Sequence, residues 1–377
     1  EVLHHPSELT DFREGPYETV FTASRLHPLK RVDLLLRAFR RVKAPLSFRI
    51  AGTGSERDRL QELAAGDDRV VFLGHVSDAQ LLDEYARALF VPFIPFDEDY
   101  GLITVEAMHS AKAVLTTVDA GGVNELVSPG QTGLSVEPDE GALAEAMTRL
   151  IADPEETRAM GRRAKEAVAH INWKDFTARF MDHLADGRRR AAAAAAVVSP
   201  AAVGPSGAAE RPRVVVVNTF AATPAVSGGR VRLLETARAL SARAHVRLLC
   251  LVSCHEAPTV LEHSPHLVEE WVPRSEEHAR RDGAYATLLG VSAEDVSAIT
   301  AWPLTPRFGE RLRALTGEAD LVVLSHPYLV DSVRWCYGGP LWLDAHNVEV
   351  DLKATLFQPG PEAEAALARV REAEGRA

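Results

Sequence analysis

Two kinds of hydrophobic pattern alternate along the first 185 residues. In Val32–Val42 the apolar side chains recur at the spacing of an amphipathic helix. In Leu89–Ile94 they are continuous, as in a strand that is buried on both faces. Such strands separated by helices indicate a parallel sheet in a doubly wound α/β domain. The predicted strands are Val20–Ala23, Ser47–Ala51, Val70–Leu73, Leu89–Ile94, Ala113–Thr117 and Leu134–Val136.

The same pattern resumes at residue 213 and predicts a second α/β domain. Two of its predicted strands each place a histidine just beyond the carboxyl end, His326 and His346. Ligands of doubly wound sheets bind at that edge, so the two histidines are site candidates. We expect His255–Pro273 to be a variable loop. The predicted strands are Arg213–Asn218, His245–Val252, Leu321–Leu324 and Leu341–Leu343.

A stretch of unusual composition separates the two patterns. It begins with three arginines, continues as polyalanine and ends rich in Pro, Gly and Ser. The alanines could extend a preceding helix, but the prolines stop it, and few large apolar side chains remain to form a core. We therefore predict a flexible linker over residues 186–212, between one domain at 1–185 and another at 213–377.

Charge and cysteine content narrow the class of protein. Lys and Arg number 42 and Asp and Glu 53, which gives a net charge of −11 and argues against a nucleic-acid partner. No apolar run approaches the roughly 18 residues of a membrane span, so we expect peripheral membrane association at most. Three cysteines are too few for a disulfide framework, and we expect a cytoplasmic protein.

Two cations follow the first predicted strand. Arg25 and Lys30 lie five residues apart in a loop at the carboxyl edge of the sheet. Paired cations in a cleft suit the negative charge of a diphosphate. The alternative is a solvated basic loop without a ligand.

Two carboxylates flank the start of a predicted helix. Glu98 and Glu106 are separated by seven residues, with Gly101 between them. We expect Thr104 to cap the helix, which would place Glu106 in its first turn and let both carboxylates face one pocket. Carboxylates accept hydrogen bonds from vicinal hydroxyls, so the pair suits a sugar or ribose. The alternative is two surface acids that the helix dipole favours.

Glycines follow two further predicted strands. Gly52 and Gly54 allow close approach of the backbone to a ligand, although a plain turn explains them equally well. Gly121 and Gly122 open another helix, whose free N–H groups would attract phosphate.

Together these motifs resemble the donor-binding C-terminal domain of retaining GT-B glycosyltransferases of family 4. The resemblance covers roughly residues 18–180, and six motifs in the family's order make it specific. The motifs are Ser24-Arg25-Leu26 with Lys30, Ala51-Gly52-Thr53-Gly54, Phe72-Leu73-Gly74-His75-Val76, Glu98-x7-Glu106-Ala107-Met108, Gly121-Gly122-x-x-Glu125 and Gly130-x-Thr132-Gly133-Leu134.

The resemblance implies a nucleotide-diphosphate-sugar donor, transfer with retention, and no metal ion or other cofactor at the site. By the family pattern Arg25 and Lys30 hold the diphosphate, and Glu106 takes the ribose hydroxyls. Glu98 is implied as the catalytic-site carboxylate beside the transferred sugar. The other implied donor-binding positions are Gly54, Val76 (against the base), Gly101, Leu102, Ile103, Gly121 and Gly122.

The second half resembles, more loosely, the acceptor-side N-terminal domain of the same fold. Gly228 and Gly229 would lie near the donor phosphates, and His346 matches the family's active-site histidine. The alternative for His346 is a strand-end histidine that caps a loop, and for His326 we favour such a structural role. The implied acceptor is a saccharide, a lipid-linked or another acceptor.

The order of the two halves is reversed with respect to one such enzyme. We expect an internal fragment of a tandem protein with two glycosyltransferases, inactive by itself, because we interpret both ends of the chain as lying inside the fold. The alternatives are one circularly permuted enzyme and a non-catalytic nucleotide-sugar-binding module. A further alternative is a zinc site at Cys250, Cys254, His255 and His263, but buried thiols explain this spacing better.

Overall fold

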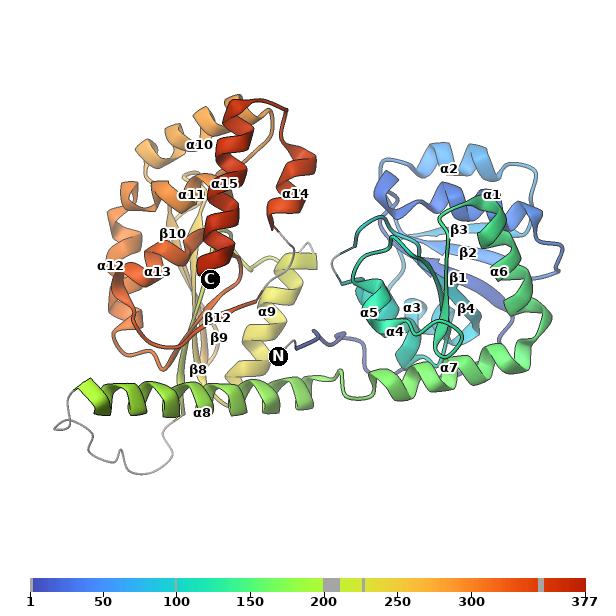
Figure 1. Cartoon of the computed structure of the whole chain (residues 1–377), viewed down its shortest axis with the longest axis horizontal. Coiled ribbons are helices and arrows are strands. Elements are labelled where there is room, and N and C mark those ends of the chain that lie inside the picture. Colours follow the sequence, from blue (N-terminus) through green and yellow to red (C-terminus); the bar gives the residue numbers. More distant parts are fainter. Residues whose placement is uncertain (1–2, 99, 199–210, 226–227, 345–348) are drawn as a thin grey trace. The chain divides into compact units, whose positions relative to one another are not determined.

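The computed structural model describes residues 3–98, 100–198, 211–225, 228–344 and 349–377. The chain forms two compact units, Glu1–Phe176 and Thr177–Ala377. Each unit is built around its own sheet, with helices packed on the sheet faces (Figure 1).

The first unit is a six-stranded sheet with the order β3-β2-β1-β4-β5-β6, and every neighbouring pair is parallel. The predicted α/β class is confirmed, and the ends of its predicted strands differ from the observed ones by two residues at most. The strands are β1 (Thr19–Ala23), β2 (Ser47–Ala51), β3 (Val70–Gly74), β4 (Ala88–Pro92), β5 (Ala113–Thr117) and β6 (Gly133–Val136).

Helices cover both faces of this sheet, which explains why its strands are apolar on both sides. The buried side chains of α1, α2 and α6 form one cluster with the sheet, and those of α3, α4, α5 and α7 form another. The helices are α1 (Val32–Arg41), α2 (Arg57–Ala64), α3 (Asp78–Arg87), α4 (Leu102–His109), α5 (Val123–Leu126), α6 (Glu140–Ala152) and α7 (Pro154–Val168).

Local sequence signals fix several helix starts. Ser77 and Gln80 form a reciprocal capping box at the start of α3, and the Asp139 carboxylate accepts two backbone N–H groups at the start of α6. The predicted cap of α4 is wrong. The helix begins at Leu102 with Gly101 as its cap residue, so Thr104 lies inside the helix, completely buried. Gly101 has a φ of 70°, which favours glycine there.

The second unit has a six-stranded sheet with the order β12-β11-β7-β8-β10-β9. Its neighbours are parallel except that β9 is antiparallel to β10, so it is again a predominantly parallel, doubly wound sheet. The strands are β7 (Arg213–Asn218), β8 (His245–Val252), β9 (Thr259–Ser264), β10 (Leu267–Pro273), β11 (Leu321–Leu324) and β12 (Leu341–Leu343).

The expectation of a variable loop at His255–Pro273 is wrong, because β9 and β10 form a hairpin there. Both strands mix glutamates with apolar residues: β9 contains Glu262, and β10 contains Glu269 and Glu270 side by side. The buried side chains of α10, α11, α12, α13, α14 and α15 pack with the sheet in one cluster, while α9 contacts β8 and β10.

The helices of this half of the chain are α8 (Trp173–Val198), α9 (Gly228–Ser241), α10 (Glu276–Leu289), α11 (Glu294–Ala301), α12 (Pro306–Thr316), α13 (Val330–Cys336), α14 (Glu349–Leu356) and α15 (Pro361–Arg376). Helix α8 includes the polyalanine run, so the first part of the predicted linker is helical. In the part of the chain that the structure describes, no helix has the length and apolar character needed to span a membrane.

Candidate functional site

The first sheet reverses its direction of growth beside β1. The chain passes from β1 to β2 and β3 and then crosses to β4, on the other side of β1. The loops after β1 and β4 therefore leave the sheet in opposite directions, and doubly wound sheets bind ligands in the crevice at such a switch point. Arg25 and Lys30 follow β1, and Glu98 follows β4.

Lys30 and Glu98 form an ion pair at this switch point. Their side chains are 22% and 25% exposed, so a ligand can reach both from solvent. Arg25 is exposed, and the structure records no ion pair between it and another described residue. The fold thus brings together one predicted cation and one predicted carboxylate, and the second predicted cation, Arg25, lies on the same loop as Lys30.

The glycines after β5 hold the backbone of Glu98. Gly122 donates its N–H to the Glu98 carbonyl at 2.6 Å. A Cβ atom on Gly121, whose φ is 67°, would lie 2.5 Å from the same carbonyl oxygen. The N–H of Gly122 is therefore already paired, and we conclude that this glycine pair positions the carboxylate loop.

The glycines after β2 have a similar packing role. A Cβ atom on Gly52 would lie 1.8 Å from the Ser24 carbonyl oxygen, and one on Gly54 would lie 2.2 Å from that of Leu26. The loop after β1 and the loop after β2 therefore pack backbone against backbone. This contact explains the glycines without a ligand, and the predicted role of Gly54 toward a donor stays a prediction.

Arg31 organises the same edge of the sheet, and the sequence analysis missed it. Its guanidinium donates two hydrogen bonds of 2.8 Å to the Asp119 carboxylate and further bonds to the carbonyls of Ile94 and Pro95 and to Thr117. The bonds from Arg31 lower the pKa of Asp119. Arg31 thus ties the loop after β4 to the loop after β5. Two features of the sequence could have predicted this role. Arg31 directly follows Lys30, and Asp119 follows a predicted strand.

Glu106 lies apart from this ion pair. It is buried on α4, where Ser7 and Tyr85 each donate a hydroxyl hydrogen bond of 2.9 Å to one of its carboxylate oxygens. Burial raises its pKa to about 7, although both hydrogen bonds oppose that shift. Neither Ser7 nor Tyr85 was foreseen, because both are distant in sequence from Glu106.

The remaining predicted donor positions surround α4 and β3. Gly101, Leu102 and Ile103 form the start of α4, where a Cβ atom on Gly101 would lie 2.9 Å from the Phe93 ring. Val76 is half-buried after β3 and packs against the same apolar cluster as Ile103. These positions lie at the carboxyl edge of the sheet, as the sequence analysis expected.

A comparison with known families identifies the part of the chain that contains this edge. Residues 17–153 match the family described as glycosyl transferases group 1. This segment is therefore similar to the group 1 glycosyltransferases. It includes every predicted site residue of the first unit and the whole of its sheet.

Relatives with established names match the chain over part of its length. The D-inositol 3-phosphate glycosyltransferase of Nocardia farcinica is 32% identical over 200 residues, which are 46% of this chain and 44% of that protein. The glycogen synthase of Mycobacterium tuberculosis is 32% identical over 171 residues, 43% of this chain and 41% of that protein. The chain therefore spans less than half the length of these two relatives.

Among solved structures, Anabaena Alr3699/HepE in complex with UDP is 24% identical. The TM-score is 0.42, over 45% of this chain and 49% of that chain.

The second unit has a pocket of about 330 Å³ at its own switch point, between β7 and β11. His326, which follows β11, makes a 2.8 Å hydrogen bond through Nδ1 to Glu349. Tyr328 donates to the same carboxylate, and Lys353 lies 2.6 Å from Asp295. His326 is thus hydrogen-bonded within its own unit, and its structural role stays a prediction. His346 lies outside the described residues, whereas Gly228 and Gly229 begin α9.

Two residues of the alternative zinc site, Cys250 and His263, contact the same carboxylate. Cys250 is buried in β8 with its Sγ 3.9 Å from Glu269, and His263 Nε2 lies 2.9 Å from the same carboxylate. Glu269 also accepts from Ala222 and Thr223, in the loop that follows β7. Within the described ranges, no group of three His, Cys, Asp or Glu residues could hold a metal ion.

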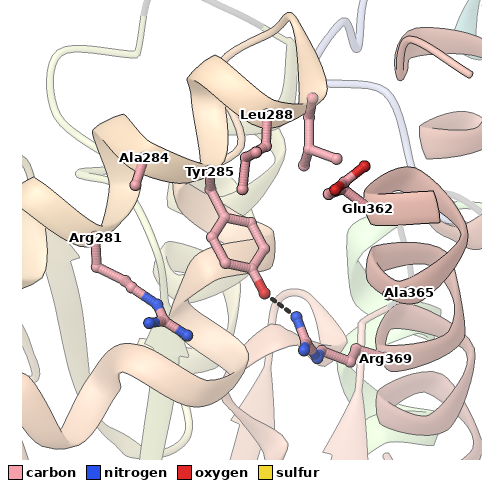
Figure 2. A pocket seen from close by; sticks show the side chains of 8 residues that line it. Arg281, Ala284, Tyr285, Leu288, Glu362, Ala365 and Arg369 are labelled. Carbon is pink, nitrogen blue, oxygen red and sulfur yellow. Dashed lines mark hydrogen bonds between the residues drawn. The ribbon is translucent and has the colours of Figure 1, made fainter. Parts of the chain in front are cut away.

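Another pocket of the second unit lies between α10 and α15 (Figure 2). It holds about 280 Å³, and its lining is mainly apolar, with Leu288 exposed at its edge. Arg369 donates a hydrogen bond to the Tyr285 hydroxyl beside it. The pocket lies away from the carboxyl edges of the strands, and we assign it no part in the chemistry.

Proposed function

We propose that the first unit binds a nucleotide-diphosphate-sugar and that the protein takes part in transferring its sugar to an acceptor with retention of configuration. The Lys30–Glu98 pair carries this proposal, because it lies at the switch point of a sheet within the group 1 glycosyltransferase segment. A cation there serves the diphosphate, and a carboxylate serves the sugar hydroxyls.

The ion pair lets the proposed site respond to the donor. A diphosphate competes with Glu98 for Lys30, since both are anions within reach of one ammonium group. Once Lys30 turns to the diphosphate, the carboxylate of Glu98 can accept hydrogen bonds from the sugar. Arg25 would supply the second cation on the same loop.

The other proposed contacts follow from the start of α4. The first turn of a helix has N–H groups without partners inside the helix, so Gly101, Leu102 and Ile103 suit polar groups of the sugar. The half-buried Val76 would lie against the base. For Glu106 to take the ribose hydroxyls, a ligand hydroxyl must add to the bonds from Ser7 and Tyr85 or replace one of them, since each carboxylate oxygen can accept more than one hydrogen bond.

For the second unit we propose an acceptor-side role, with Gly228, Gly229 and His346 facing the donor phosphates of a partner domain. The two relatives are named for D-inositol 3-phosphate and for glycogen, so the acceptor class stays broad: a saccharide, a lipid-linked or another acceptor. Because an acceptor-side unit here follows a donor-binding unit, we propose a tandem arrangement in preference to a circularly permuted enzyme. We further propose that transfer needs no metal ion and that the protein is cytoplasmic.

A donor screen on the full chain tests the proposal. Nucleotide-diphosphate-sugars should raise the melting temperature in proportion to the logarithm of their concentration above Kd. Lys30→Ala should weaken the best donor about tenfold or more, because it removes a charge-assisted contact. Lys43→Ala changes an exposed lysine on the surface of the same unit and should leave binding unchanged.

A second variant tests the proposed role of the Glu98 carboxylate. Glu98→Gln should weaken nucleotide-sugar binding but not binding of the nucleotide diphosphate alone, because its proposed partner is the sugar. Glu62→Gln, at an exposed position of α2, is the control. The donor proposal fails if no nucleotide sugar stabilises the chain, or if Lys30→Ala and Lys43→Ala behave alike. Retention is tested by the anomeric configuration of the product formed with the matching acceptor.

A further inference from the structure

A third pocket of the second unit lies at one edge of its sheet. The opposite edge holds His326 and the start of α9 with Gly228 and Gly229. The pocket holds about 410 Å³ and is formed at the amino ends of β7, β8 and β10, beside α12. The residues that line it are Arg213, Val214, Val215, His245, Val246, Arg247, Pro265, His266, Val268, Arg311, Ala314, Leu315 and Glu318. It is separate from both switch-point sites.

The lining combines a cationic rim with an apolar floor. Arg213, Arg247 and Arg311 line the pocket together with two histidines, and Glu318 is the one carboxylate among the described lining residues. Val215, Val268 and Leu315 supply the apolar part. A cavity of this size with a few convergent polar groups is typical of a small-molecule site.

The arginines differ in what they contact. Arg213 pairs with Glu318 at 2.7 Å, and Arg311 makes two bonds, of 2.6 and 2.8 Å, to Glu270. For Arg247 the structure records no ion pair or hydrogen bond among the described residues, and its side chain is exposed. The pocket therefore contains a cation that can take an anionic ligand without first breaking a salt bridge.

The two histidines form a second feature of the rim. His245 and His266 face each other with their Nδ1 atoms 3.2 Å apart and their ring centroids 4.8 Å apart. One Nδ1 must donate the hydrogen bond and the other must accept it. The pair can therefore gain one proton and keep this bond. A second proton would make both Nδ1 atoms donors and break the bond. The Nε2 atoms of both rings are left to face a ligand.

Desolvation and nearby positive charge disfavour a proton on His266 when no anion is present. Desolvation, Arg211 and His245 lower the pKa of His266. An anion in the pocket would offset the arginines and favour the protonated pair, so that binding takes up a proton. The charged groups around the histidines are Arg211, Arg213, Arg247, Arg311, Glu270 and Glu318.

We propose that this amino-edge pocket binds a small phosphate monoester, with the phosphate group on Arg247 and the histidine pair and the organic part on the apolar floor. The site is independent of the donor proposal, since none of its residues belongs to the first unit. Strand amino ends offer no helix N-terminus to an anion, so the side-chain cations must supply the attraction.

Calorimetric titration of the full chain tests the proposal. At pH 8, where inorganic phosphate and phenyl phosphate are both dianions, phenyl phosphate should bind about fivefold more tightly because its ring contacts the floor. Arg247→Gln should weaken both by about tenfold. Arg243→Gln, at an exposed arginine outside the lining, should change neither by more than about twofold.

Proton uptake is measured with sulfate, whose own charge does not change near neutral pH. Titrations at pH 6.5 in two buffers with different ionisation enthalpies should show uptake of a fraction of a proton by the wild type and almost none by the double variant His245→Gln with His266→Gln. Thermal unfolding of each variant confirms that it is folded.

Three outcomes would overturn anion binding at this pocket, and a fourth would overturn the monoester assignment. The first three are the absence of saturable binding of all three anions at millimolar concentration, equal weakening by the two arginine variants, and sulfate binding without proton uptake. A phenyl phosphate affinity no higher than that of inorganic phosphate would exclude the organic part and overturn the monoester assignment.

Discussion

Glu106 in the first unit and Glu269 in the second are both buried carboxylates, yet their pKa values shift in opposite directions. Burial raises the pKa of Glu106 to about 7, and its two hydroxyl partners, Tyr85 and Ser7, offset only part of that effect. Burial would also raise the pKa of Glu269, but its hydrogen bonds outweigh burial and lower it.

The number of donors accounts for the difference. Nitrogen and oxygen donors surround Glu269 at 2.7 to 3.2 Å, whereas Glu106 has two hydroxyls. We infer that Glu269 is a fixed anchor for the loop after β7, while Glu106 can exchange a partner for a ligand hydroxyl. The donors to Glu269 are the backbone N–H groups of Ala222 and Thr223, the Thr223 hydroxyl, His263 Nε2 and the Trp271 indole.

The anchor role predicts the largest effect. Glu269→Gln places an amide among groups that all donate, and it should lower the free energy of unfolding of the second unit by about 4 kcal/mol. Urea titration followed by tryptophan fluorescence measures it, because four of the five tryptophans lie in that unit. Glu262→Gln, exposed on the neighbouring β9, should cost less than about 0.5 kcal/mol. Equal costs for the two variants would contradict the anchor.

Glu106 should make the first unit less stable as the pH rises. Its folded-state pKa lies above its ordinary value of 4.5, so the stability it contributes is complete below pH 4.5 and is lost as the pH passes through 7. Between these pH values the free energy of unfolding of the wild type should fall by at most about 3 kcal/mol relative to that of Glu106→Gln. Hydrogen exchange of peptides from α4 at pH 5 and 8 measures the difference, with Glu62→Gln as control. A pH-independent difference would refute the raised pKa.

Removing one hydrogen-bond donor to Glu106 should increase the difference between its pKa and that of Glu269. Tyr85→Phe deletes a hydroxyl bond to the carboxylate, so it should raise the pKa of Glu106 further and cost about 1–2 kcal/mol at pH 8 but less at pH 5. The same exchange measurement reports this change. In the Glu106→Gln background the pH dependence of the cost should disappear, and its persistence would place the effect elsewhere.

Cys250→Ala should have the smallest effect. The thiol lies 3.9 Å from Glu269 and is a minor member of the donor set, so its loss should cost about 1 kcal/mol, mainly for the small cavity left behind. Urea titration gives this value, and metal analysis of the wild type accompanies it. A stoichiometric zinc ion lost in this variant would instead favour the metal alternative.

The sequence predicted most of the parallel strands well because they are short and rich in apolar residues. Ser47–Ala51 and Ala113–Thr117 match β2 and β5 at both ends. The β9–β10 hairpin was missed because glutamates and histidines interrupt its apolar residues and made the stretch resemble a surface loop. The cap of α4 was misplaced because Thr104 has the side chain of a good cap, while the backbone turn at Gly101 depends on contacts with Phe93 and Val123.

For the candidate site, strand-end position and residue type were sufficient to select Lys30 and Glu98. They were not sufficient for Arg31, whose role depends on carbonyls more than 60 residues away. Nor did they show that Glu106 would be buried, because Ser7 and Tyr85 reach it from distant parts of the chain. Long-range packing decided these outcomes.

Hydrogen exchange of the full chain, with and without a saturating nucleotide-sugar, tests the central claim most directly. We predict that protection increases in residues 24–31, in 96–104 and in 119–123, which hold Lys30, Glu98 and the Gly121–Gly122 turn, and that Lys30→Ala abolishes the increase. Two results would contradict a donor site at this switch point. One is that the nucleotide-sugar leaves hydrogen exchange in these three segments unchanged, and the other is that the increase in protection persists in Lys30→Ala.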